Sequence, residues 1–331
     1  MANIVKKTIF YYNQNEMIED NNESDDNLKE NYNLWIDVSD PTDTDIENLE
    51  KRFSLNKKAL DRVRQKSKKP VVKETENNSK FAILLDIKFN NFEHLDPSPL
   101  YFFVGDRWLI TIHSDNVDLV AKVKTILADR KTILESSIDA LYYSIISYIV
   151  EDYEQLLTAI ELKVFDIEKD AQYRPSKKVL TYLDTLSRQV ITLRRHFWDA
   201  RNIINYHVNM EKDKDEIKYL QIVYNNINQL IEMIQSYQDT VNSTRDLFSN
   251  SVSLQMNETM RVLTIFSAIV LPLSLLIGVL SLQGFDLNNL PILPKYLGYL
   301  VLLMLIITIM PLFVFWRKKW IFSYDKQIKS K

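Results

Sequence analysis

The chain contains no cysteine and only four glycines and nine prolines among its 331 residues. Because cysteine is absent, disulfide scaffolds, thiolate metal sites and cysteine nucleophiles are excluded. The scarcity of glycine and proline disfavours glycine-rich phosphate loops and favours long helices. The sequence also lacks a Ser/His/Asp arrangement and an HExxH motif, so we expect neither enzymatic activity nor a bound cofactor, and no nucleic-acid partner.

The few histidines do not form a recognisable metal site. His113 ends a predicted strand, and His196 and His207 lie eleven residues apart on one face of a predicted helix. No further ligands accompany that pair, so the pattern favours packing or surface residues over a metal site.

Charge is distributed unevenly, and the net charge of −3 hides this. Residues 1–260 carry 33 basic and 42 acidic side chains, whereas residues 261–331 carry 8 basic and 2 acidic side chains. Two uncharged stretches, 262–282 and 296–316, each have 21 residues. Such a length gives about 31 Å of helix, the thickness of a bilayer's hydrocarbon core. Residues 283–295 contain glycine, prolines and paired asparagines, so the sequence predicts two transmembrane helices joined by an extracytoplasmic loop.

The cations predict the orientation of these spans. Arg261 precedes the first span, and Arg317, Lys318 and Lys319 begin the basic tail 317–331, whereas the loop carries one acid and one base. Since positive residues stay on the cytoplasmic side, both termini are expected in the cytoplasm. The N-terminus lacks the apolar stretch of a signal peptide, so we expect a multi-pass protein of the cell membrane.

The N-terminal part of the chain predicts an α/β domain over residues 1–130. Residues 35–38 favour a strand, and Asp40-Pro41-Thr42-Asp43 then predicts a helix start, with Asp40 as N-cap and proline in the first helical position. The clustered acids resemble a calcium loop, but its required glycine is missing, so capping is favoured. Further strands are predicted at 81–89 and 101–112, the second broken by a turn at Gly105-Asp106. The acidic stretch 19–26 is expected to be a solvated loop.

The rest of the cytosolic part is predicted to be helical. Residues 131–212 favour a helical hairpin, and residues 213–261 favour a stalk helix that continues into the first span, since neither glycine nor proline occurs between Pro175 and Pro272. One helix of that length cannot cover its own faces, so we expect association with copies of itself.

A polar stripe runs along this long helix in alternating steps of three and four residues. Ten of its thirteen members are polar. The stripe comprises Asp239, Ser243, Asp246, Asn250, Ser253, Asn257, Met260, Thr264, Ser267, Leu271, Ser274, Gly278 and Ser281. Within lipid its hydroxyls must face other helices or water. Two interpretations stay open: a water-filled cation path, or a dry helix–helix seam of small residues. The continuation of the stripe on both sides of the membrane boundary favours the path.

Several motifs carry a resemblance to a known family. They are WIDVSDPT at 35–42, YFFVGDRWLITIH at 101–113, the segment from Met256 to Leu282 and the ending WRKKW. In order and spacing these resemble the CorA family of magnesium/cobalt transporters along nearly the whole chain. The resemblance implies a homopentamer with an α/β cytosolic domain, a long stalk helix that lines the pore, and a second helix packed outside it. It also implies pore-lining positions at Asp246, Ser253, Asn257, Met260, Leu271, Ser274 and Gly278.

The sequence departs from the family at the end of the first span. Where the family carries Gly-Met-Asn, whose asparagines hold the incoming hydrated cation, this chain has Ser281-Leu282-Gln283. A one-residue shift would instead place Gly284 at the asparagine position. The zinc-transporting branch of the family keeps the glycine and the asparagine, and this chain does not match that signature either.

We therefore expect channel-type transport of divalent cations through a central pore, with Gln283, Asn257 and Asp246 in contact with the hydrated ion. Pore-lining roles extend to Thr264, Ser267 and Ser281. Magnesium is the expected ion, cobalt or another divalent metal the alternative, and Mg²⁺ is also a candidate gating ligand. The expected partners are further copies of the chain, the lipid bilayer and divalent cations. A non-conducting membrane sensor or scaffold, zinc transport, and an unrelated ion or proton-coupled mode stay open.

Overall fold

The computed structural model describes residues 6–12, 17–20, 32–74, 79–90, 94–129, 137–280 and 293–317. The chain divides into two compact units, Met1–Arg245 and Asp246–Lys331. The first unit contains a sheet and several helices, and the second contains the two longest apolar stretches of the chain.

A seven-stranded sheet organises the first unit, in the order β2-β1-β3-β7-β6-β5-β4. Its strands are β1 (Lys6–Tyr12), β2 (Met17–Asp20), β3 (Asn33–Ser39), β4 (Val71–Glu74), β5 (Lys80–Asn90), β6 (His94–Val104) and β7 (Trp108–His113). Only β3 and β7 pair in parallel among these strands. The strands predicted at 35–38, 81–89 and 101–112 lie in β3, β5 and the β6–β7 hairpin, and the turn at Gly105 is confirmed by its N–H donating to the Trp108 carbonyl at 2.8 Å.

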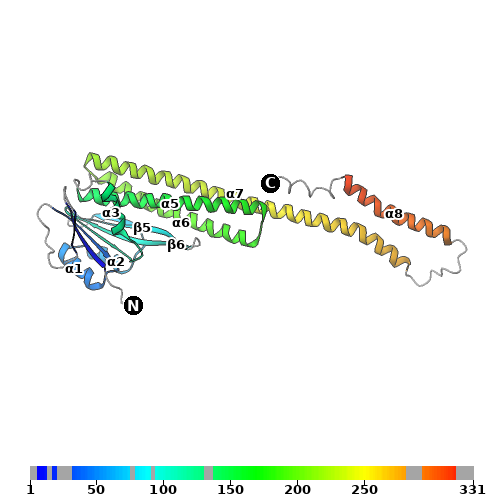
Figure 1. The fold of residues 1–331 in the computed structure, drawn as a ribbon, viewed down its shortest axis with the longest axis horizontal. Helices are drawn as coiled ribbons and strands as arrows, with labels where there is room; N and C mark the ends of the chain where they lie inside the picture. Colours follow the sequence, from blue (N-terminus) through cyan, green and yellow to red (C-terminus); the bar gives the residue numbers. More distant parts are fainter. Residues whose placement is uncertain are drawn as a thin grey trace. The chain divides into compact units, whose positions relative to one another are not determined.

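Helices cover both faces of this sheet. They are α1 (Asp43–Phe53), α2 (Lys57–Arg64), α3 (Leu119–Asp129), α5 (Ile138–Tyr173), α6 (Lys177–Met210) and α7 (Lys214–Leu280), and α8 (Leu293–Arg317) follows in the second unit. Figure 1 shows α1 and α2 on one face of the sheet and α5 and α6 on the other. The core between the sheet and the short helices includes Ile36 and Ile110 from the strands and Leu60 from α2, all fully buried.

The predicted start of α1 is corrected in one respect. The N-cap is Thr42, whose side chain accepts from the Asp45 N–H in a capping box, so Pro41 precedes the cap instead of opening the helix. Asp40 lies before the helix with a φ of 45°. Its carboxylate accepts from the Asp115 N–H at 3.1 Å, and its own N–H donates to the His113 carbonyl at 2.8 Å. Asp40 therefore joins the loops after β3 and β7, and the Thr42 hydroxyl caps α1 in its place.

A buried polar network links these two parallel strands. The Trp35 indole N–H donates to Thr111 Oγ1 at 3.0 Å, and Thr111 in turn donates to Asp37. His113 Nε2 lies 3.0 Å from Asp37 Oδ2, and its Nδ1 lies 2.8 Å from the Ser114 carbonyl. Both ring nitrogens face oxygen acceptors, an arrangement that favours the protonated ring. Burial alone would lower the pKa of His113, but the hydrogen bond and charge of Asp37 raise it overall.

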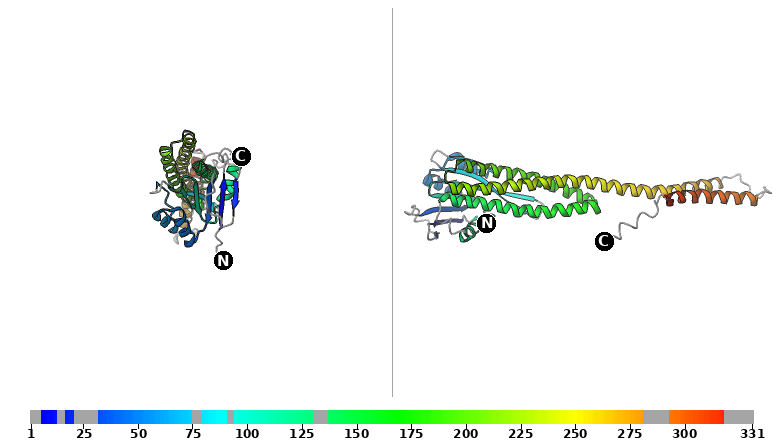
Figure 2. Two further views of the ribbon diagram at one scale, coloured as in Figure 1. Left: turned by 90° about the vertical axis from the view of Figure 1, so that its left-hand side faces the viewer. Right: turned by 90° about the horizontal axis from the view of Figure 1, so that it is seen from above.

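Three helices form the layer on the other face, and Figure 2 shows α5, α6 and the first part of α7 running side by side. In that part, α7 buries a regular series of apolar residues: Leu220, Val223, Ile227, Leu230, Ile234 and Val241. Their spacing of three, four and seven residues places them on one face of the helix. The amphipathic pattern, rather than intrinsic propensity alone, therefore fixes α7 against its neighbours.

Candidate functional site: the polar face of α7 and a carboxylate cluster

The polar stripe predicted from the sequence lies on α7. Its members from Asp239 to Gly278 all fall within this helix, which runs unbroken through Pro272. Ser281 and Gln283, the predicted entrance of the pathway, lie outside the described residues, as do Leu282 and Gly284. The second predicted span, 296–316, falls within α8.

The stripe begins on the face of α7 that the first unit leaves open. Val241 is 3% exposed and continues the buried series, whereas Asp239 and Ser243 beside it are exposed. Two residues along a helix correspond to about 200° of rotation, so Asp239 and Ser243 lie on nearly the opposite side from Val241. The polar face is thus not the face that packs on α5 and α6.

Beyond residue 245, most side chains of α7 are uncovered by the rest of the chain. Of the described stripe members in the second unit, Asp246, Asn250, Ser253, Asn257, Met260, Thr264, Leu271, Ser274 and Gly278 are exposed and Ser267 is half-buried. On the other faces, Leu263 and Phe266 are 57% and 63% exposed. Among the described residues, one helix is long and apolar enough to cross a membrane, and it is α7, with none of the apolar stretch buried. Such a surface requires lipid, further protein or both.

Three hydroxyls of the stripe, those of Ser243, Ser253 and Thr264, donate their hydrogens to carbonyls of the helix itself. Ser253 Oγ donates to the Ser249 carbonyl at 2.9 Å, and Thr264 Oγ1 donates to the Met260 carbonyl at 2.7 Å. A hydroxyl in this arrangement keeps its acceptor lone pairs for an outside partner. The stripe can therefore accept hydrogen bonds from water molecules around a cation.

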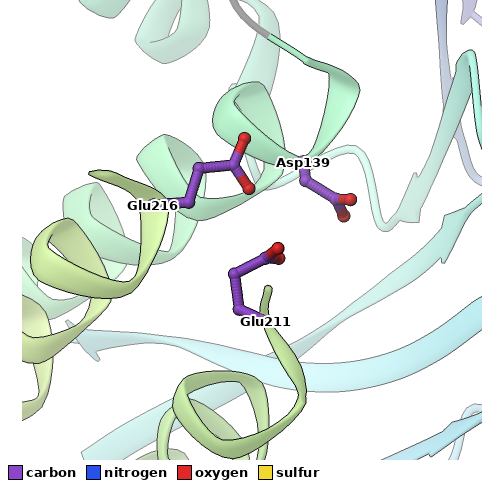
Figure 3. A group of neighbouring side chains, drawn as sticks. All are labelled: Asp139, Glu211 and Glu216. Carbon is purple, nitrogen blue, oxygen red and sulfur yellow. The ribbon is translucent and has the colours of Figure 1, made fainter. Parts of the chain in front are cut away.

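A second polar group, which the sequence did not reveal, lies in the first unit. Asp139 at the start of α5, Glu211 after α6 and Glu216 in the first turn of α7 bring carboxylate oxygens within 4.8 Å of one another. Figure 3 shows the three side chains extending into the same space from these three elements. All three are partly buried.

The neighbours of this carboxylate cluster partly balance its charge. Lys80 Nζ lies 2.9 Å from Asp139 Oδ1, the Tyr143 hydroxyl donates to Glu211 at 2.7 Å, and Ser137 donates to Glu216. Burial, with the neighbouring acids adding to it, raises the pKa of Glu216 to about 7. Burial would also raise the pKa of Glu211, but the hydrogen bonds from Tyr143 and from backbone N–H groups lower it overall.

One carboxylate of the cluster therefore gains or loses a proton near neutrality while another stays ionised. The members are 5 and more than 70 residues apart in the chain, and acids at those spacings give no periodic pattern. The packing of α5 beside α6, together with the turn between α6 and α7, brings them together, which is why the sequence did not predict the cluster.

Of the two histidines on α6, His207 packs in the interior and His196 is half-buried. His207 is fully buried, and its Nε2 shares a hydrogen bond of 3.0 Å with the Tyr142 hydroxyl. Burial lowers the pKa of His207 to about 3 and that of His196 to about 4, so both rings are neutral at physiological pH. Among the described residues, neither joins a group of potential metal ligands.

Sequence comparison places most of the chain in one family. The model of the CorA-like Mg2+ transporter protein family matches residues 30–319. The chain is similar to the cobalt/magnesium transport protein CorA of Thermotoga maritima, with 25% identity over 294 residues covering 87% of this chain and 83% of that protein. It is also similar to the cobalt/magnesium transport protein CorA of Methanocaldococcus jannaschii, with 22% identity over 302 residues covering 88% of this chain and 93% of that protein.

Solved structures share the fold. The complete structure of the CorA magnesium transporter from Methanocaldococcus jannaschii matches with a TM-score of 0.79 at 20% identity, covering 97% of this chain and all of that chain. The full-length CmaX protein matches with a TM-score of 0.73 at 18% identity, with the same coverage. At this identity the structures establish the fold alone. The match to the family model establishes membership, and the chain belongs to the CorA family of divalent-cation transporters. The members of this family are membrane proteins and not enzymes.

Proposed function

We propose that five copies of the chain form a channel that conducts divalent cations, magnesium being the expected ion and cobalt or another divalent metal the alternative. In this proposal α7 lines the central pore, and α8 packs outside it with both termini in the cytoplasm. The observation that carries the proposal is the polar stripe of α7, which lies away from the face that packs on α5 and α6 and stays uncovered in the single chain.

The chemistry of the stripe fits a hydrated ion. Water bound to a cation presents its hydrogens outward, so a path for hydrated cations needs acceptors. Ser253 and Thr264 supply such acceptors because their own hydrogens are bound to carbonyls one turn earlier. Asp246 and Asn257 add a carboxylate and amides on the cytosolic side. Met260, Leu271 and Gly278 interrupt the polar series and would form its apolar constrictions.

The entrance is proposed from the sequence alone. Gln283 would supply the ring of amide oxygens that accepts hydrogen bonds from the water shell of the ion, with Ser281 one step below it. We further propose Mg²⁺ as a gating ligand between neighbouring cytosolic domains, supported by the excess of acids in residues 1–260.

A non-conducting sensor or scaffold of the same architecture is the second candidate, because Ser281-Leu282-Gln283 replaces the family's Gly-Met-Asn. The same stripe would then be a dry seam between helices. Cation uptake into liposomes that contain the purified chain separates the two. Uptake that falls in Gln283→Leu at equal protein abundance supports the channel and its entrance.

A cysteine scan tests the pore lining directly, since the chain has no cysteine of its own. Single cysteines at Thr264, Ser267 and Ser274 should react with a water-soluble thiol reagent, which requires the thiolate and hence water. Matched cysteines at Ile265 and Ile269, on other faces of the helix, should stay inert. If the stripe positions are as inert as the two isoleucine positions, the stripe is a dry seam and the channel proposal is wrong.

A further inference from the structure

The parallel strands β3 and β7 continue into helices on opposite faces of the sheet. β3 leads into α1, which packs with α2 on one face. β7 leads into α3, where Lys122 pairs with Asp152 of α5, so α3 lies on the face that α5 covers (Figure 1). When neighbouring parallel strands send their connections to opposite faces, a crevice is left outside their carboxyl ends, and ligands of open α/β sheets bind there. The topology therefore favours a ligand site at the ends of β3 and β7.

A cavity of about 530 Å³ occupies this place. The segment 40–43 after β3 and the segment 113–116 after β7 form two of its walls, and parts of α1, α2, β6 and the segment after α2 form the rest. Its volume lies in the range of roughly 300–1,000 Å³ that is typical of sites for small organic molecules. Four apolar or aromatic side chains of its lining are at most 5% exposed: Ile46, Val63, Tyr101 and Ile112. The cavity therefore has an apolar floor.

Charged side chains of both signs line the cavity, and they come from different elements. The acids are Asp40 and Asp43 after β3 and Asp96 on β6, and the cations are Arg64 at the end of α2 and Lys66 and Lys68 after it. His113 also reaches the lining, but Asp37 balances its charge. Three acids and three cations leave no net charge, so the lining favours neither a simple anion nor a simple cation. A ligand with one charge of each sign meets complementary charges in the lining.

The cations after α2 keep donors for a ligand. The Lys66 ammonium forms no ion pair among the residues that the structure describes. Lys68 Nζ lies 4.0 Å from Asp96 Oδ1, which is too far for a hydrogen bond. Arg64, by contrast, is occupied by several acids, of which Asp61 is the nearest at 3.3 Å. Lys66 and Lys68 are therefore the groups that can take up a carboxylate.

The acids after β3 keep acceptors for a ligand. Asp43 Oδ1 lies 3.8 Å from Arg64 Nε, which is again too far for a hydrogen bond. Asp40 Oδ2 accepts from the Asp115 N–H at 3.1 Å, and its second oxygen is left for another donor. An ammonium group has three donors, so it suits a wall that offers more than one carboxylate.

The backbone at Asp40 and Lys66 is held in the left-handed region. Their φ angles are 45° and 48°, and among the described residues Ser54 is the one further non-glycine residue with a positive φ. Hydrogen bonds hold both positions, since the Asp40 N–H donates to the His113 carbonyl at 2.8 Å and the Lys66 N–H to the Val63 carbonyl at 2.9 Å. Strained backbone is concentrated at ligand sites, where the surrounding structure maintains it. Here it coincides with one charged group of each sign.

We propose that this cavity binds a small zwitterion, a molecule with a free ammonium and a free carboxylate on an apolar body, such as an apolar amino acid or a dipeptide. Asp40 and Asp43 receive the ammonium, Lys66 and Lys68 receive the carboxylate, and the apolar floor receives the body. A phosphate ester would bring net negative charge to three acids without a matching excess of cations. The cavity lies wholly within the first unit, so the proposal does not depend on whether the chain conducts ions.

The test uses the full chain purified in detergent and probes that share an apolar side chain but differ in their charged ends. Leucine and leucyl-leucine carry both charges, N-acetyl-leucine keeps only the carboxylate, and leucinamide keeps only the ammonium. Isothermal titration calorimetry at millimolar probe concentrations should show binding of at least one zwitterion. Each single-charge analogue should bind about tenfold more weakly or not at all, because it lacks one set of hydrogen bonds to charged groups. Ribose 5-phosphate, as a simple anion, should not bind.

Charge variants decide whether the cavity is responsible. Lys66→Gln and Asp43→Asn should each weaken binding of the zwitterion about fivefold, the loss expected for one partly exposed charge pair. Both side chains are exposed, so the fold should be kept, and circular dichroism checks this. Lys58→Gln and Glu47→Gln remove the same charges from exposed positions of α2 and α1 outside the lining and should leave the affinity unchanged.

The proposal is overturned when neither zwitterion binds the full chain. Equal or tighter binding of a single-charge analogue or of ribose 5-phosphate also overturns it, because the site would then recognise one charge alone. An equal loss of affinity in the cavity variants and the control variants overturns it as well, since binding would then lie elsewhere on the protein.

Discussion

Replacing Asp37 by asparagine should reveal how much the buried charge pair between β3 and β7 stabilises the first unit. The asparagine amide would keep an oxygen that accepts from Thr111, so the change removes the charge and little of the shape. His113 is 5% exposed and Asp37 3% exposed, so solvent cannot replace the lost partner. Breaking a buried pair costs about 3–5 kcal/mol, and we expect the lower end because the hydrogen-bonding oxygen is retained. At about 2–4 °C per kcal/mol for a unit of this size, the melting temperature should fall by roughly 6–12 °C.

The pH dependence of this fall in melting temperature tests whether the His113 ring is protonated in the folded chain. The pKa of His113 is raised in the folded state. A raised pKa stabilises the fold fully below the unfolded value of about 6.5, and that stabilisation disappears as the pH rises through the folded-state pKa. The difference in melting temperature between the native chain and Asp37→Asn should therefore be largest at acidic pH and smaller at alkaline pH.

Thermal unfolding of the full chain in detergent, followed by circular dichroism from pH 5.5 to 9, measures this difference. Asp61→Asn serves as the control, because Asp61 is paired with Arg64 but its side chain is 58% exposed. The control should change the melting temperature by about 1 °C, as exposed pairs contribute little. A loss of less than 1 °C in Asp37→Asn, or the same loss at every pH, would refute a charged His113 in the folded state.

Two further substitutions test the first unit. Glu216→Gln should stabilise the fold above pH 7 and leave it unchanged below pH 5, because the native pKa of about 7 means that stability falls as the pH rises from the ordinary value of 4.5 through 7. The gain should be on the order of 1 kcal/mol after allowance for the half-exposed position, and an equal gain at pH 5 and pH 8 would exclude titration of Glu216 as the cause. Gly105→Ala should destabilise by about 1–3 kcal/mol, since a Cβ there would meet Trp108 Cε2 at 2.2 Å, and an unchanged denaturant midpoint would show that the ring moves freely.

Local pattern was enough to predict β3, β5, β6, β7 and the long helix, whereas β1, β2 and β4 were not predicted. The apolar run of β5 and the glycine of the β6–β7 turn are short-range signals, and they proved correct. The cap of α1 was predicted wrongly because Asp40, Thr42 and Asp43 are all acceptable N-caps by residue type. The choice depends on Asp115, 75 residues away, which binds the Asp40 carboxylate. A contact at that separation leaves no trace in the local pattern.

The site shows the same division between local and long-range information. The stripe of α7 could be found from the sequence because a helix converts spacing into position on a face. The carboxylate cluster could not, since Asp139 meets Glu211 and Glu216 only after α5 and α6 have paired and the chain has turned into α7. The network of Trp35, Thr111 and Asp37 likewise requires β3 and β7 to lie in register.

The two halves of α7 differ in what covers their apolar residues, because the chain buries those of the first half and leaves those of the second half exposed. In the first unit, Val223 and Ile234 are buried against the chain's own helices. In the second unit, Leu263 and Leu275 are more than half exposed although they are equally apolar. Lipid can cover such residues but offers no hydrogen-bond donor to the hydroxyl oxygens of the stripe, even where, as at Thr264, the hydroxyl hydrogen is bound to the Met260 carbonyl. A helix with both kinds of face needs lipid or protein on one side and water or further helices on the other, and the ring of identical helices that we propose would provide both with a single sequence.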